Sequence, residues 1–70
     1  MSSLEESIKR ILLNTLPSLS VETKLEIVSK LQTSGVESVD DLKYVQQEDL
    51  NDLLPVIQQR KLLEAFKLGN

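Results

Sequence analysis

The sequence predicts an all-α fold, a compact bundle of five helices with a longer C-terminal helix. Apolar residues recur at spacings of three and four, which is the period of an amphipathic helix. Pro17, Gly35 and Pro55 stand where helices are expected to end or begin. No segment alternates polar and apolar residues, and no Asn-Gly or Asp-Gly pair indicates a β-hairpin. We expect one domain over residues 1–70, with an ordered core at 3–67.

The first predicted helix covers residues 4–16. Ser3 and Glu6 form a capping-box signature at its start, and Pro17 ends it. An amphipathic helix can also bind a membrane surface or a partner, but the balanced charge of its polar face favours packing in the core. Its apolar stripe consists of Leu4, Ile8, Ile11, Leu12 and Leu16.

The second predicted helix has Ser20 as its N-cap and runs to Thr33. Gly35 stands where a left-handed C-terminal cap is expected. The residues predicted to line the buried face of this helix are Val21, Leu25, Val28 and Leu31.

Two short helices are predicted next. A capping box of Ser38 and Asp41 begins the third helix, which continues through Leu42 and Val45. The fourth helix covers residues 47–54. Its side chains expected to point inward are Leu50, Leu53 and Leu54.

The last helix is predicted to carry Pro55 in its first turn and to end near Gly69. The two aromatic residues, Tyr44 and Phe66, are interpreted as core or core-rim residues. The side chains of this helix expected in the core are Val56, Leu62, Leu63 and Phe66.

Composition excludes most site chemistry. The chain has 70 residues, no Cys and no His, which removes disulfides, thiolate nucleophiles, zinc sites and nearly all routine general bases. A domain of this size has no room for a substrate cleft of the usual volume. We therefore expect no enzymatic activity and no cofactor. Two aromatic residues are also too few for a base-stacking platform.

Neither a membrane-spanning segment nor a secretion signal is recognisable in the sequence. The longest apolar run is residues 11–13, and Glu5 and Glu6 stand where a signal peptide carries positive charge. We expect an intracellular location by default, in the cytoplasm or nucleus. The short length is compatible with a domain of a larger protein.

Charge changes sign abruptly in the last third of the chain. Residues 36–54 carry a net charge of −5, and residues 55–70 carry +2, whereas the first 35 residues are balanced. An acidic surface beside a basic helix can pair head to tail with a copy of itself or with a relative. The acidic segment has no Gly for an EF-hand loop and reads as helix, so metal binding is not expected.

Three strings in this region resemble the C-terminal half of a sterile alpha motif (SAM) domain. They are Asp41-Leu42, Glu48-Asp49-Leu50 and Arg60-Lys61-Leu62-Leu63, in the family's order of a third, a fourth and a basic fifth helix. The N-terminal half is matched by helix count only, because the usual aromatic residues of the first two helices are absent.

The resemblance implies a protein-interaction module with two binding surfaces. The charge change falls on these two surfaces, and the partner would be another SAM-like domain or a second copy of the chain, giving a homo-oligomer. The implied end-helix face consists of Pro55, Val56, Gln58, Gln59, Arg60 and Lys61. The implied mid-loop face consists of Asp40, Asp41, Glu48, Asp49 and Asp52.

Several alternatives stay open at this point. The charges can form merely solvated faces, because an exposed ion pair contributes about 0–1 kcal/mol. Some SAM domains bind RNA, but the basic residues here are few and the net charge of −3 repels phosphate. A structural regulatory domain without self-association is a third function. A helix-turn-helix DNA reader and a death-domain fold are alternative folds.

Overall fold

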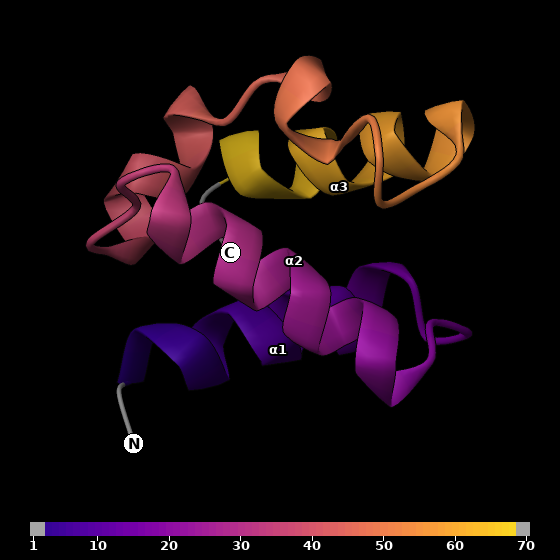
Figure 1. Cartoon of the computed structure of the whole chain (residues 1–70). Helices are drawn as coiled ribbons and strands as arrows, with labels where there is room; N and C mark the ends of the chain where they lie inside the picture. Colours follow the sequence, from indigo (N-terminus) through magenta and orange to yellow (C-terminus); the bar gives the residue numbers. More distant parts are fainter. Residues whose placement is uncertain (1–2, 69–70) are drawn as a thin grey trace.

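A computed structural model describes residues 3–68, and within this range the chain is helical without strands (Figure 1). The predicted all-α, compact fold is confirmed. The predicted count of five helices is not confirmed, because the third and fourth elements are short 3₁₀ helices instead of α-helices. The elements in chain order are α1 (Ser3–Thr15), α2 (Val21–Thr33), η1 (Val39–Tyr44), η2 (Gln47–Leu50) and α3 (Val56–Lys67).

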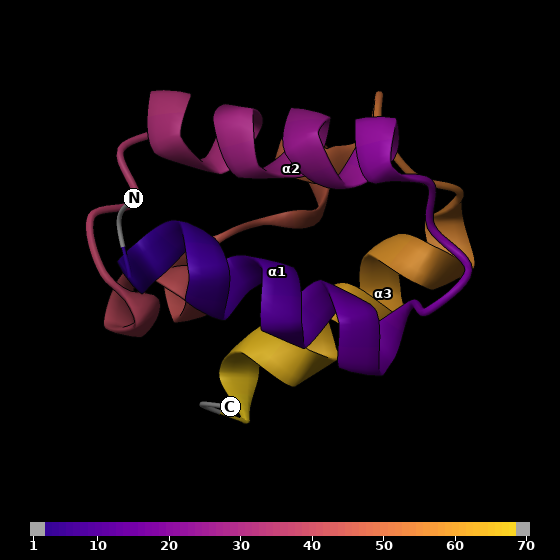
Figure 2. The ribbon, with the colours of Figure 1, turned by 90° about the horizontal axis from the view of Figure 1, so that it is seen from below.

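The three α-helices enclose the core together with the 3₁₀ helices. α1 and α2 run antiparallel, joined by a short turn, and α1 also contacts α3 (Figures 1 and 2). Both 3₁₀ helices contact α3, and η2 also contacts α2. The molecule measures 26 × 23 × 21 Å. No helix among residues 3–68 has the length and apolar character needed to cross a membrane.

One cluster of buried apolar side chains forms the core, and every helix contributes to it. The predicted stripe of α1 is confirmed, with Leu4 half-buried at its edge. The buried members are Ile8, Ile11, Leu12, Leu16, Ile27, Val28, Leu31, Val36, Leu42, Leu50, Leu54, Leu62 and Phe66.

The caps of α2 are those that the sequence predicts. The Ser20 hydroxyl accepts a hydrogen bond from the Thr23 backbone N–H at 3.2 Å. At the other end Gly35 adopts φ +105°. The backbone N–H of Val36 then donates to the Leu31 carbonyl at 3.1 Å, and that of Gly35 donates to the Gln32 carbonyl at 3.1 Å, the two bonds of a Schellman motif. This cap directs the chain from α2 into η1.

The predicted buried face of α2 is wrong at two positions. Val21 and Leu25 are 70% and 48% exposed, and Ile27 occupies the core in their place. α1 and η2 both contact α2, and they pack on the side that carries Ile27 and Leu31. Tyr44, expected in the core or at its rim, is 72% exposed.

The boundaries of the last two elements also differ from the prediction. The fourth element stops at Leu50, and turns fill residues 51–54. Pro55 is the N-cap of α3 with ψ 156°, one position before the predicted place. Consequently α3 has 12 residues against 13 in α1, so the C-terminal helix is not longer. Its predicted end near Gly69 lies outside the described residues.

Candidate functional site

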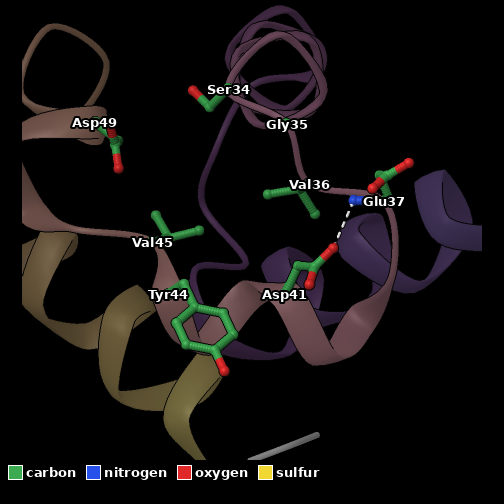
Figure 3. A pocket seen from close by; sticks show the side chains of 8 residues that line it. All are labelled: Ser34, Gly35, Val36, Glu37, Asp41, Tyr44, Val45 and Asp49. Carbon is green, nitrogen blue, oxygen red and sulfur yellow. Dashed lines mark hydrogen bonds between the residues drawn. The ribbon is translucent and has the colours of Figure 1, made fainter.

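A concave pocket of about 300 Å³ opens where α2 ends and η1 and η2 follow (Figure 3). The turn at Gly35 brings the end of α2 close to the two 3₁₀ helices. Acidic side chains come from the segment after α2, from η1 and from η2. We call this site the acidic pocket, and its lining residues are Ser34, Gly35, Val36, Glu37, Asp41, Tyr44, Val45 and Asp49.

Backbone hydrogen bonds hold two carboxylates of the acidic pocket in place. Asp41 Oδ2 accepts from the Glu37 N–H at 2.9 Å (Figure 3). Asp49 Oδ2 accepts from the Gln46 N–H at 2.9 Å. The predicted capping box of Ser38 and Asp41 is therefore wrong, because the Asp41 carboxylate accepts from the residue before Ser38. Each of these bonds uses one carboxylate oxygen, and a carboxylate has acceptor capacity left on the other.

Tyr44 lies at the edge of the acidic pocket with its ring exposed (Figure 3). The Nζ of Lys43 lies 5.4 Å from the centroid of the ring, within the range of a cation–π contact. The acidic pocket therefore combines carboxylates with an exposed aromatic ring that already has the Lys43 ammonium beside it.

The structure separates the predicted mid-loop residues into two groups. Asp41 and Asp49 line the acidic pocket. Asp40, Glu48 and Asp52 are exposed but do not line it, and Asp52 belongs to the turn that leads into α3.

Two residues of this site are not identified by the sequence. Glu37 contributes to the charge of the acidic segment, but only its place two residues after the Gly35 turn hints at a role in a surface. Tyr44 is predicted in the core, and only the packing of η1 shows that it is exposed. Apart from its place at the end of a short segment, no sequence signal indicates the exposure of Tyr44.

The start of α3 forms a second surface, which we call the basic end. It consists of the exposed residues Pro55, Val56, Ile57, Arg60 and Lys61. Ile57 is 58% exposed and is missing from the predicted end-helix face, and Val56, expected to point to the core, is 48% exposed. Gln58 is half-buried and lines a cleft of about 190 Å³ against the α1–α2 turn.

Gln59 is predicted on the end-helix face, and that assignment is wrong. Its side chain is 1% exposed, and its Nε2 donates to the backbone carbonyl of Leu54. Position 59 precedes Leu62 by three residues and Phe66 by seven, so it shares their buried helix face. Gln59 therefore packs in the core beneath the exposed residues of the basic end, and a partner cannot contact its side chain.

The acidic pocket and the basic end lie on opposite sides of the molecule. η1 and the start of α3 occupy opposite ends in both views (Figures 1 and 2). One molecule therefore cannot bring its own two surfaces together. Within residues 3–68 no cluster of acidic side chains is arranged to hold a metal ion.

A comparison with known protein families identifies the class of this small helical domain. The family model described as SAM domain-like matches residues 17–68. The chain belongs to this family, whose members are generally non-catalytic protein-interaction modules. The match begins before α2 and leaves α1 outside it, as expected from the resemblance of the C-terminal half. No curated protein and no solved structure gives a match.

Proposed function

We propose that this chain is an interaction module that associates head to tail, with itself or with another SAM-like domain. In this arrangement the basic end of one molecule docks against the acidic pocket of the next. The observation that carries the proposal is the placement of a concave acidic surface and an exposed basic helix start on opposite sides of the molecule.

The start of α3 is suited to an acidic partner for two reasons. The first N–H groups of a helix have no carbonyl partner within the helix, and the helix dipole adds partial positive charge there. Arg60 and Lys61 follow in the next turn and are exposed. A carboxylate docking at this point gains charge-assisted hydrogen bonds as well as Coulomb attraction.

Apolar contact supplements the charges on both sides. Val56 and Ile57 are exposed beside Arg60 on the basic end. Val45 and the Tyr44 ring line the acidic pocket opposite. Burial of these groups stabilises a complex that charge pairs alone would hold weakly, since exposed ion pairs contribute little.

Head-to-tail contact has a consequence for the assembly. An interface between two different surfaces leaves one of each free on every dimer, so further molecules add until a ring closes or a filament forms. This distinguishes the proposal from a symmetric dimer, which uses the same patch on both molecules.

Paired charge reversals test the proposal by sedimentation velocity. Arg60→Glu with Lys61→Glu reverses the charge of the basic end. Glu37→Lys with Glu48→Lys reverses one acidic residue of the acidic pocket and the exposed acidic residue next to Asp49, and it leaves the two bonded carboxylates unchanged. We expect each double variant to sediment as a monomer, and an equal mixture of the two to form a heterodimer and nothing larger.

The matched control is Glu22→Lys with Glu26→Lys, which makes the same charge change on exposed positions of α2. It should assemble like the unchanged chain. Persistence of oligomers in both test variants would overturn the two-surface arrangement. If the unchanged chain is monomeric at every concentration, self-association is excluded, and mixing with a second SAM-like domain then tests the remaining form of the proposal.

A further inference from the structure

A third surface is a groove of about 350 Å³ between α1 and α2, and it shares no lining residue with the acidic pocket or the basic end. The two helices run antiparallel and contact each other (Figures 1 and 2). The residues that line the groove are Lys9, Arg10, Leu13, Val21, Lys24 and Leu25. Half of this surface belongs to α1, which lies outside the residues matched by the family.

The groove exposes three aliphatic side chains in one place. Leu13 is 54% exposed, Val21 70% and Leu25 48%. Val21 and Leu25 are four residues apart, so they form one row along α2, with Leu13 on the neighbouring helix. Single exposed apolar residues are ordinary, but a contiguous apolar patch with a polar rim indicates a binding surface.

The rim of the groove is positively charged. Lys9, Arg10 and Lys24 line it, and no acidic residue does. Glu22 and Glu26 are on the same helix as Lys24, but their positions place them on another face. Lys9 pairs with Glu5 at 3.0 Å, whereas within residues 3–68 Arg10 and Lys24 have no ion pair. Two cations therefore stand beside an apolar patch without a charged partner from the described chain.

We propose that this groove binds an acidic amphipathic helix of another protein, with its apolar residues on Leu13, Val21 and Leu25 and its carboxylates on Arg10 and Lys24. Helices commonly dock in this way, with apolar residues at spacings of three and four in a groove between two helices. Charge complementarity selects an acidic partner over a neutral or basic one.

Two other occupants fit less well. Within residues 3–68 the elements outside the groove offer no matching helix, because the exposed apolar residues of α3 stand beside Arg60 and Lys61, and the acidic residues of the −5 segment are on short 3₁₀ helices and turns. An anionic membrane is flat, whereas this surface is concave.

A display library of randomised helix-forming peptides tests the proposal directly, because such a library samples many sequences of the proposed class. The full chain serves as bait, and selected peptides are measured by fluorescence anisotropy. We expect the selected peptides to place leucine-like residues at spacings of three and four with Asp or Glu beside them. Arg10→Glu with Lys24→Glu should weaken their binding by at least about tenfold, and Leu25→Ser should do the same.

Lys30→Glu is the matched control, because Lys30 is exposed on α2 but does not line the groove. It should leave binding unchanged, as should the charge reversals at the basic end. Selection of peptides without acidic residues, or binding that survives both groove variants, would overturn the proposal. Binding of anionic lipid vesicles that the groove variants abolish, with no peptide selected, would assign the groove to a membrane and equally overturn it.

Discussion

The side-chain amide of Gln59 donates a hydrogen bond to the backbone carbonyl of Leu54 inside the core. This bond ties the first turn of α3 to the turn that precedes it, across the N-cap residue Pro55. The other amide atom, Oε1, is buried and has no partner within the described residues. Gln59 thus links α3 to the turn before it, next to the residues of the basic end.

Removing this amide should destabilise the chain. Gln59→Ala leaves the Leu54 carbonyl buried without its donor and opens a cavity, so we expect the free energy of unfolding to fall by about 2–4 kcal/mol. Urea denaturation followed by circular dichroism measures it. Gln58→Ala, one position away and half-buried, is the control and should cost less. Equal losses in the two variants would contradict the role of the buried amide.

Gln59→Glu should make the stability depend on pH. Burial raises the pKa of the introduced carboxyl in the folded chain above its value in the unfolded chain. The folded state then binds more protons, so stability is greatest below the unfolded pKa and falls as pH rises through the folded pKa. Thermal denaturation at pH 4 and pH 7 should show a larger difference for this variant than for the unchanged chain. A parallel change in both proteins would argue against burial of the carboxyl.

Local signals in the sequence located most of the fold. The α1 stripe has a single period, and Ser20 and Gly35 cap α2 through bonds to residues nearby in the chain. Such interactions are determined by a few neighbouring residues, so pattern reasoning finds them. The predictions are wrong where two stripes overlap, as on α2, because packing against α1 and η2 selects Ile27 over Leu25.

The candidate surfaces could be predicted only in outline. The sequence indicates which segments are acidic and which are basic, because that depends only on the positions of charged residues along the chain. It does not show that Gln59 faces inward, because a polar residue is ordinarily expected to be exposed. Nor does it show the acidic pocket, which depends on the turn at Gly35 placing the end of α2 beside η1 and η2.

Gly35 should resist substitution because of its backbone angle alone. A Cβ at this position would have open space within 4 Å, so no steric contact opposes it. The φ of +105° nevertheless disfavours any L side chain. We expect Gly35→Ala to lower the free energy of unfolding by about 1–2 kcal/mol, and Gly35→Val to lower it further. Ser34→Ala, at the neighbouring position with φ −75°, should have little effect in the same urea titration.

Asp41 and Asp49 should contribute to stability as well as to charge. Each carboxylate accepts a backbone hydrogen bond, so Asp41→Ala and Asp49→Ala should each cost about 0.5–2 kcal/mol, as for other caps. Glu48→Ala removes the same charge from an exposed position and should leave stability unchanged. Chemical denaturation distinguishes the two groups. Equal stability in all three variants would show that the two bonds carry no net free energy.

Association through the acidic pocket and the basic end should weaken as salt is added. Both surfaces are exposed, and the Debye length falls from about 10 Å at 0.1 M ionic strength to about 3 Å at 1 M. We therefore expect the weight-average mass in sedimentation equilibrium to fall toward that of a monomer over this range.

The apolar contacts of Val56 and Ile57 would not weaken in the same way, because salt screens charges and leaves apolar burial intact. An assembly whose mass is independent of salt would therefore be held by the apolar residues, and Ile57→Ser should dissociate it where Arg60→Glu does not.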